Sequence, residues 1–208
     1  MSVQIYVLLL VLLCIIVVSV SSVTTIKITN KDYYDKVKLD IELEQMIESE
    51  RKIDLFLHEN DIRPGVSIKR IADILNVKEG GVDQEILSQA CLKENCFTGE
   101  KVVVFKEELS EQDKNFVFAH EIAYILNGDS IPVTRPVGRN KSQTEQLTDY
   151  TAAALLMPID HVFDFLQKNH YMEASAKKRM VFVRQLCKEY MVNEMIVLRR
   201  VKEIYAIK

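Results

Sequence analysis

Cysteine is scarce in this chain, which has four cysteines among 208 residues. One of them, Cys14, lies in an apolar segment, so the rest of the chain holds the odd set Cys91, Cys96 and Cys187. Such a set does not predict the disulfide framework of a small secreted domain, and it fits a reducing compartment. Cys91 and Cys96 also lack the two-residue spacing of a zinc knuckle. If the body were secreted they could pair; otherwise they are small apolar residues near a turn.

Charge is absent from residues 2–26, and residues 5–18 are almost wholly apolar. About 20 apolar residues span a bilayer as a helix, so residues 1–26 are predicted to form a single-pass transmembrane anchor. A cleaved signal peptide with a small-residue site at Ser19-Val20-Ser21 is the alternative, but it requires a positive N-terminal region that this chain lacks. Because the first basic residues all follow the segment, we expect a membrane protein with a cytoplasmic body. These residues are Lys27, Lys31, Lys36 and Lys38.

Repeats, low-complexity tracts and a strong net charge are absent as well, the formal charge being −3. The two ends of the body nevertheless differ. Residues 32–61 carry ten acidic and four basic residues, whereas residues 171–208 carry four acidic and nine basic residues. The basic end permits contact with DNA or an anionic membrane. We favour a solvated helical face, and expect no nucleic-acid binding, because no arginine-rich or aromatic reading surface stands out.

The stretch His120-Glu121-Ile122-Ala123-Tyr124 carries the clearest chemical signal. Two histidines four residues apart on a helix share a face and hold one zinc ion, while the glutamate after the first histidine acts as general base. Here His120 and Glu121 are present, but Tyr124 holds the second histidine position. Ser110 is a typical N-cap, Asn127-Gly128 a typical helix end, and nearly every face between them is apolar. The sequence therefore predicts a buried central helix in which His120 and Glu121 need partners.

A second helix is predicted around Glu145 and Asp149, which lie four residues apart and so face the same way. A zinc peptidase of the His-His-Glu kind takes its third ligand from a second helix, and Glu145 is available for that role. Asp149 could accept a hydrogen bond from the far nitrogen of His120 and orient the ring. The alternative is a helix with two solvated acids and an apolar face.

Together the two segments resemble the ImmA/IrrE family of metallo-endopeptidases. That family typically shows a phenylalanine-rich helix ending in Ala-His-Glu-x-x-His, then Glu-x-x-Ala-Asn/Asp and Ala-Ala-x-Leu-Leu-Met-Pro. Residues 116–129 and 145–158 match these patterns closely, and looser similarity extends over about residues 68–203. The resemblance implies zinc as cofactor, His120 and Glu145 as metal ligands, Glu121 as catalytic base and Asp149 as supporting acid. It also implies a protein substrate or partner, such as the helix-turn-helix repressors that family members cleave.

Tyr124 is the departure from this pattern, and it falls on a metal ligand. Tyrosine binds metals only as phenolate, and a free pKa of about 10 makes that form scarce at neutral pH. His120 and Glu145 alone leave two protein ligands where a catalytic zinc site has three. We therefore expect proteolysis to be impaired or lost, unless His161 or His170 supplies a ligand. The alternatives are a non-catalytic, membrane-tethered protein-binding regulator and, ranked below it, a DNA-binding regulator.

The remaining elements predict an α+β fold of the zincin-like kind, mostly helical with a small β-sheet and preceded by the transmembrane helix. Helices are expected over residues 32–60 and, after a break at Arg63-Pro64-Gly65, over residues 68–76 with Ser67 as cap. Strands are expected over residues 86–92 and 101–105, and one of them should form a sheet edge where an extended substrate can pair. Residues 182–190 and 194–204 resemble a helix-turn-helix.

Four parts of the chain are expected from these patterns. Residues 1–26 form the transmembrane anchor or signal segment, and residues 27–64 an acidic juxtamembrane helical region. Residues 65–165 form the ImmA/IrrE-like metallopeptidase domain, and residues 166–208 a basic C-terminal helical segment.

Overall fold

The computed structural model of the protein describes residues 41–63, 67–86, 88–128 and 142–208. These residues all belong to one compact unit, Leu39–Lys208. The predicted anchor, residues 1–26, lies outside the described residues. Within the described ranges, no helix is both long enough and apolar enough to cross a membrane.

The described part of the chain is mostly helical, and its strands follow one another between helices α3 and α4. In chain order they are α2 (Leu43–Glu59), α3 (Ile68–Ile74), β1 (Val77–Val82), β2 (Ala90–Glu94), β3 (Lys101–Phe105), α4 (Glu111–Asn127), α5 (Gln143–Leu156), α6 (Ile159–Lys168), α7 (Ala176–Tyr190) and α8 (Glu194–Ile207). This content confirms the expected α+β class, mostly helical with a small sheet.

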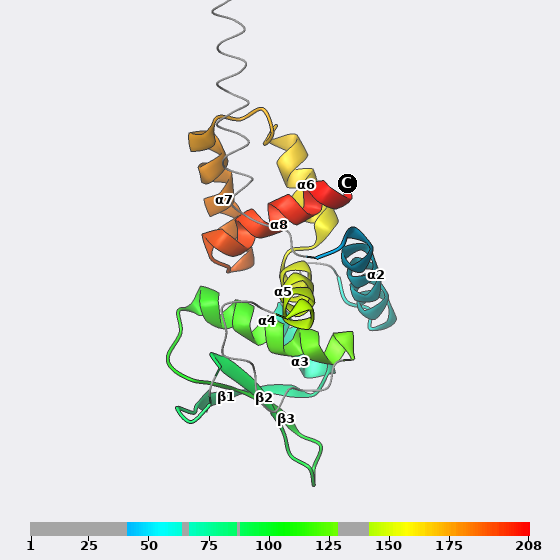
Figure 1. The fold of residues 1–208 in the computed structure, drawn as a ribbon, viewed down its shortest axis with the longest axis vertical. Helices are drawn as coiled ribbons and strands as arrows, with labels where there is room; N and C mark the ends of the chain where they lie inside the picture. The colour runs from blue at the N-terminus through cyan, green and yellow to red at the C-terminus, as the bar shows by residue number, and fades with distance from the viewer. Residues whose placement is uncertain (1–40, 64–66, 87, 129–141) are drawn as a thin grey trace, which may run out of the picture. The chain divides into compact units, whose positions relative to one another are not determined.

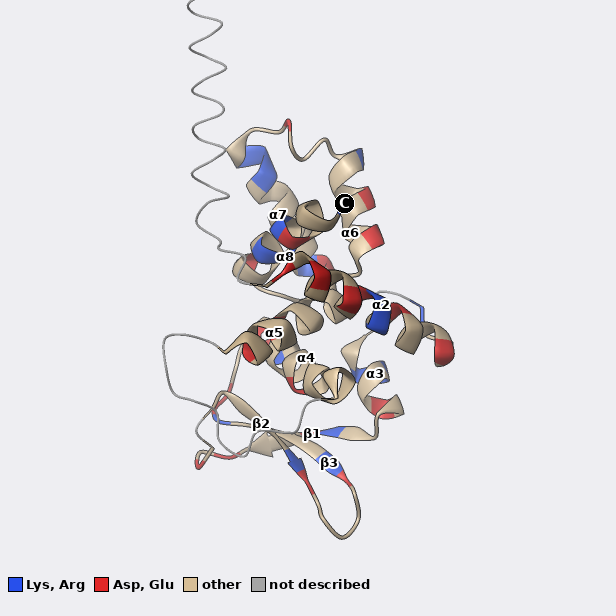
Figure 2. Ribbon diagram, turned by 45° about the vertical axis from the view of Figure 1, so that its right-hand side comes forward, with Lys and Arg blue, Asp and Glu red and all other residues tan. Residues whose placement is uncertain are grey.

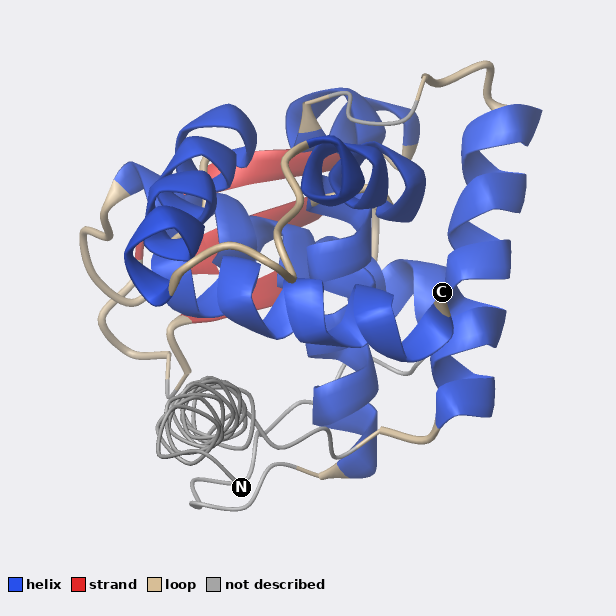
Figure 3. Cartoon of the chain, turned by 90° about the horizontal axis from the view of Figure 1, so that it is seen from above, coloured by secondary structure: helices blue, strands red, loops and turns tan. Residues whose placement is uncertain are grey.

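The elements are stacked in layers (Figure 1). Helix α4 lies across the sheet, α5 crosses α4 on the side away from the strands, and α6, α7 and α8 lie beyond α5. Seen from above, the strands lie beneath the helices (Figure 3). Helices α4 and α5 therefore occupy the centre of the unit, between the sheet and the C-terminal helices.

The sheet has three strands in the order β1-β3-β2. Strand β3 pairs in parallel with β1 and antiparallel with β2. The prediction of a strand over residues 101–105 is confirmed. The prediction over residues 86–92 is wrong in its bounds, because β2 begins only at Ala90 and continues to Glu94. Strand β1 was not predicted, since its central residues Lys78-Glu79-Gly80-Gly81 lack the apolar alternation of a half-buried strand.

Helix α4 begins and ends where its sequence predicts. The Ser110 side chain accepts a hydrogen bond from the Asp113 N–H, and Gly128 adopts a left-handed conformation with φ 73° at the C-terminal end. Both features satisfy backbone groups that a helix terminus leaves unpaired. The helix is buried from Phe118 through Tyr124, which places the predicted catalytic motif inside the unit.

Alanines allow α4 and α5 to pack closely. Ala119 and Ala123 of α4 are fully buried. The alanines of α5 have exposed fractions of at most 1%; they are Ala152, Ala153 and Ala154. Small side chains let two helix backbones approach, and buried polar groups on the facing turns then lie within contact distance. This packing brings the two predicted motif helices together.

The C-terminal helices form the expected pair, with α7 and α8 separated by Met191–Asn193. Figure 2 shows basic residues at the start of α7 and acidic residues along α6. Helix α2 packs on α5, where the buried Ser49 and Thr151 hydroxyls lie 2.8 Å apart. The long helix expected over residues 32–60 is described only from Leu43 to Glu59, and residues 32–40 lie outside the described ranges.

Candidate metal centre

The three motif residues of α4 are nearly inaccessible to solvent. The exposed fractions are 5% for His120, 1% for Glu121 and 2% for Tyr124. Asp149 of α5 is 3% exposed, and the Glu145 side chain, one turn nearer the start of α5, is 15% exposed. All five predicted site residues are therefore largely buried, and four of them, His120, Tyr124, Glu145 and Asp149, contact one another between α4 and α5.

His120 lies between two carboxylates. Its Nδ1 is 2.8 Å from Asp149 Oδ1, and its Nε2 is 3.5 Å from Glu145 Oε2. Both are ion-pair distances, although neither ring nitrogen has an oxygen well aligned with its N–H direction. Burial alone would lower the pKa of His120, but the contacts with Asp149 and Glu145 outweigh it and raise that pKa above its ordinary value. Asp149 therefore lies beside one ring nitrogen of His120, as its predicted supporting role requires, while that role itself stays a prediction.

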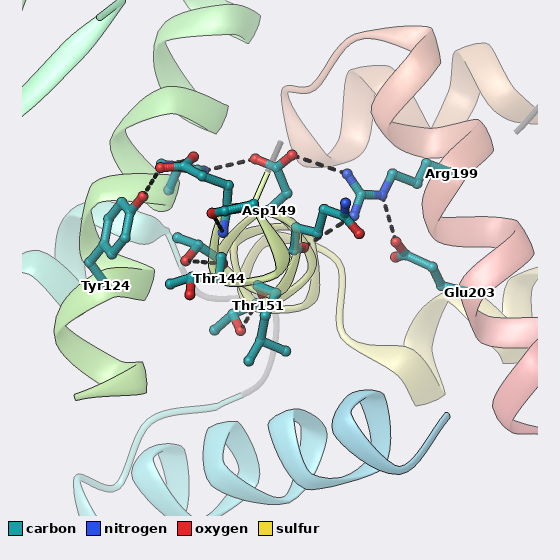
Figure 4. Close-up of polar contacts among 12 residues, drawn as sticks. Tyr124, Thr144, Asp149, Thr151, Arg199 and Glu203 are labelled. Carbon is teal, nitrogen blue, oxygen red and sulfur yellow. Dashed lines mark hydrogen bonds and ion pairs between the residues drawn. The ribbon is translucent and has the colours of Figure 1, made fainter. Parts of the chain in front are cut away.

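Tyr124 turns its phenol toward Glu145. Its hydroxyl donates a short hydrogen bond to Glu145 Oε1, while the ring stands edge-on to His120 with centroids 5.2 Å apart. Figure 4 shows this contact beside Asp149. The phenol is thus a hydrogen-bond donor to the predicted glutamate ligand, and it occupies one of that ligand's two oxygens.

The donor set matches zinc in part only. Two donors bound at about 2.0–2.2 Å to a tetrahedral ion lie about 3.4 Å apart, which is close to the 3.5 Å between His120 Nε2 and Glu145 Oε2. The third donor is lacking. Among the described residues, no group of three His, Cys, Asp or Glu side chains is placed to hold a metal ion. The residues present therefore do not fit a three-ligand zinc site, although two of them are placed for one.

His161 and His170 do not complete the site. His161 is an exposed residue of α6, and the side chain of His170 is 83% exposed and lies near Glu173. The possibility that either histidine rescues the ligand set is thus contradicted by their placement on the surface, outside the α4–α5 interface.

Glu121 contacts the sheet edge. Its Oε2 accepts a hydrogen bond of 3.1 Å from the Leu92 N–H of β2. Backbone bonds join Gln89 to Lys106 and Asn95 to Glu100, so by antiparallel alternation the Leu92 N–H points away from β3. Strand β2 is an edge of the sheet. The predicted catalytic base therefore links α4 to the outer edge of β2.

Two site residues were missed by the sequence analysis, Arg199 and Glu203 of α8. Arg199 Nη1 lies 3.2 Å from Asp149 Oδ2, and its Nε lies 2.7 Å from Glu203 Oε1 (Figure 4). Burial opposes the charge of Arg199, but Glu203 and Asp149 raise its pKa; burial raises the pKa of Glu203. No short motif connects these residues to His120. The signal in the sequence was a basic pair, Arg199-Arg200, in an otherwise apolar helix turn.

Comparison with known proteins bears on this geometry. No curated protein matches the chain. The family model described as IrrE N-terminal-like domain, Peptidase M78, matches residues 78–202. The match begins in β1 and ends in α8, so it covers the sheet, both motif helices and Arg199. On this match, which spans more than half of the sequence, the chain belongs to the IrrE N-terminal-like peptidase family.

Proposed function

We propose that this protein is an ImmA/IrrE-type metallopeptidase domain whose proteolytic activity is impaired or lost, and whose target is a regulatory, repressor-like protein. The observation that carries the proposal is the hydrogen bond from the Tyr124 phenol to Glu145. Residue 124 stands at the position of a zinc ligand in the family pattern, but here its side chain donates a hydrogen bond to Glu145, the neighbouring predicted ligand.

The physical reason is the number of ligands. Removing a residue that only supports a metal ligand costs about 10–100-fold in metal affinity or activity, and removing a ligand itself costs more. A water molecule becomes a nucleophile at neutral pH only when a firmly held metal lowers its pKa to about 7. With two donors, His120 and Glu145, weak zinc binding leaves Glu121 without an activated water to deprotonate.

A non-catalytic binding role is the second candidate, and the position of Glu121 favours it. This carboxylate contacts the β2 backbone, which is a structural use of the residue. Since Glu121 occupies the outward Leu92 N–H of β2, the other edge strand, β1, is the one that can pair along its length with an extended segment of another protein, without any cleavage. A DNA-binding role has less support, because Arg199 and Arg200 of the basic C-terminal helices form internal ion pairs.

Metal content tests the proposal. The full chain, purified as wild type, as Tyr124→His and as Tyr124→His with His120→Ala, would be analysed for bound zinc. We expect little zinc in the wild type, about one ion per chain in Tyr124→His, and its loss when His120 is also removed. Stoichiometric zinc in the wild type, or proteolysis that a chelator abolishes, would overturn the proposal.

Membrane tethering through residues 1–26, with the body in the cytoplasm, is part of the proposal. Its support is the absence of charge in residues 2–26 and the basic residues that follow. The full chain should stay with the membrane after alkaline carbonate extraction, and a deletion of residues 1–26 should not. A processed chain that begins after Ser21 would show instead that the segment is a signal peptide.

A further inference from the structure

Arg199 belongs to the last helix of the chain, yet it contacts the helix that carries Asp149. Each of its three guanidinium nitrogens contacts a different acceptor. Nη1 lies 3.2 Å from Asp149 Oδ2, Nη2 donates to the Gln146 carbonyl at 3.3 Å, and Nε donates to Glu203 at 2.7 Å. A planar guanidinium held at three points has little rotational freedom. Arg199 is therefore a fixed donor on the α8 side of α5.

Asp149 is fixed from both sides by this arrangement. Its Oδ2 contacts Arg199, and its Oδ1 contacts His120 Nδ1 at 2.8 Å. A carboxylate whose two oxygens have different partners cannot rotate without losing one of them. Figure 4 shows Asp149 between α4 and α8, with Arg199 and Glu203 on the side away from Tyr124. Arg199 of the C-terminal helix thus contacts one oxygen of Asp149, while the other oxygen lies beside the His120 ring.

Burial makes the chain of contacts electrostatically strong. The Glu203 side chain is 0% exposed, that of Asp149 is 4% exposed and that of Arg199 is 24% exposed. Because Arg199 stands between the two carboxylates, it offsets charge that would otherwise push Asp149 away from Glu203. Asp149 thus has a guanidinium on one side and the His120 ring on the other.

We propose that Arg199 is a positioning residue of the His120 centre, which it reaches from α8 through Asp149. The inference rests on the proposed function, since it treats the residues around His120 as the centre through which this protein acts. It does not depend on whether the wild type holds zinc, because the contacts are present without an ion. The basic C-terminal segment thereby contributes to the centre and is not only a cover for the core.

The first arm of the test uses the wild-type full chain. Ring signals of His120 would be followed by ¹⁵N NMR at one fixed pH, with assignment from His120→Asn. Arg199→Met should speed exchange of the ring N–H with water by about tenfold, whereas Arg184→Met, which removes an exposed pair with Glu194, should not. Equal ring exchange in the two variants would show that Arg199 is only a structural bridge.

A loss of folding must be separated from a loss of positioning. Arg199→Met removes the guanidinium that contacts Glu203 and leaves this buried carboxylate with only Arg200 nearby among the described residues, so the paired variant Arg199→Met with Glu203→Gln removes both charges of the contact. This pair should keep the wild-type circular dichroism and still show the faster ring exchange. Recovery of slow exchange in the pair would place the effect in the stability of α8 and would overturn the proposal.

The second arm uses Tyr124→His and measures zinc affinity by competition with a chelator. Adding Arg199→Met should weaken zinc binding about 10–100-fold, and adding Arg184→Met should leave it unchanged. Equal zinc affinity in the two would contradict the proposal. If Tyr124→His takes up no zinc, the proposed function fails, while the ring-exchange arm still decides the role of Arg199.

Discussion

At the scale of single residues, the phenol of Tyr124 has a consequence for stability as well as for metal binding. A buried centre with His120, Glu121, Glu145 and Asp149 carries several acidic groups in a small space. In an active metalloenzyme the ion would offset part of that charge. Here the Tyr124 hydroxyl donates to Glu145, and a raised pKa favours the protonated form of His120. The Tyr124 hydroxyl therefore satisfies one of the acidic groups of this centre, and its removal should weaken the fold.

Replacing Tyr124 by phenylalanine tests this interpretation. The variant removes a donor to a charged acceptor while keeping the ring, so we expect a loss of about 1.5–3 kcal/mol in the free energy of unfolding. Urea denaturation in the presence of a chelator measures it. Tyr190→Phe, which removes a hydroxyl outside the centre, is the matched control and should cost less. Equal losses would mean that the Tyr124 hydroxyl has no special role.

The thiols should differ in reactivity according to their surroundings. Cys96 is exposed in the β2–β3 connection, whereas Cys187 is buried in α7 and burial raises the pKa of its thiol. Since the thiolate is the nucleophile, iodoacetamide at pH 8 should modify Cys96 at least about tenfold faster than Cys187. Mass spectrometry of a time course measures both rates. Similar rates would indicate that the end of α7 opens in solution.

Much of the centre could be predicted from residues alone because it lies in two short motifs. His120, Glu121 and Tyr124 occupy one helix turn, and Glu145 and Asp149 occupy another, so helical periodicity alone predicts their shared faces. Arg199 and Glu203 could not be predicted in this way. The contact of Arg199 with Asp149 spans 50 residues of sequence and depends on how α8 crosses α5, and Glu203 joins the centre only through Arg199.

At the scale of elements, capping residues were the reliable signals and strand bounds were not. Ser110 and Gly128 delimit α4 as predicted. Strand β1 escaped prediction because it is an edge strand with one well-buried residue, Val77, and exposed residues such as Lys78. What makes it a strand is its parallel pairing with β3, which is a tertiary contact and leaves no local pattern.

The close approach of β3 requires a glycine at position 80 of β1. A Cβ at this position would lie 2.7 Å from Val102 Cγ1 and 3.0 Å from the Val103 carbonyl oxygen. We expect Gly80→Ala to destabilise the fold by about 1–3 kcal/mol, because the β3 backbone cannot move away easily.

The neighbouring glycine supplies the control for this experiment. A Cβ on Gly81 would have no atom within 4 Å, so Gly81→Ala should change the unfolding free energy by less than about 0.5 kcal/mol. Urea midpoints of the two variants decide the matter, and similar midpoints would contradict the described register of β1 against β3.

At the scale of the whole unit, Arg200 joins helices that are far apart in the sequence. It is fully buried, its Nη1 lies 2.7 Å from Glu50 Oε1 of α2, and its Nε donates to the Met157 carbonyl at 3.0 Å. The guanidinium also lies 5.4 Å from the centroid of the Tyr150 ring. Arg200 thereby connects α2, α5 and α8. Its contact on α5 is with Tyr150, the residue after Asp149.

Removing Arg200 alone should be severe. Arg200→Met leaves the Glu50 carboxylate, whose side chain is 12% exposed, without its main counter-charge, and we expect a loss of about 3–5 kcal/mol. Adding Glu50→Gln should restore most of that stability, since the unpaired charge is then gone. The exposed pair of Arg184 and Glu194 is the control, with a cost of about 0–1 kcal/mol for Arg184→Met. Thermal and urea unfolding of the full chain measure all three variants.

The strand order has a consequence for synthesis on the ribosome. Strands β1 and β2 both pair only with β3 within the described sheet, and β3 is the last of the three to be translated. Until Lys101–Phe105 emerges from the exit tunnel, the two earlier strands have no ladder to join. The nascent chain should therefore acquire its sheet in a single late event, and arrest before Lys101 should leave it open to protease.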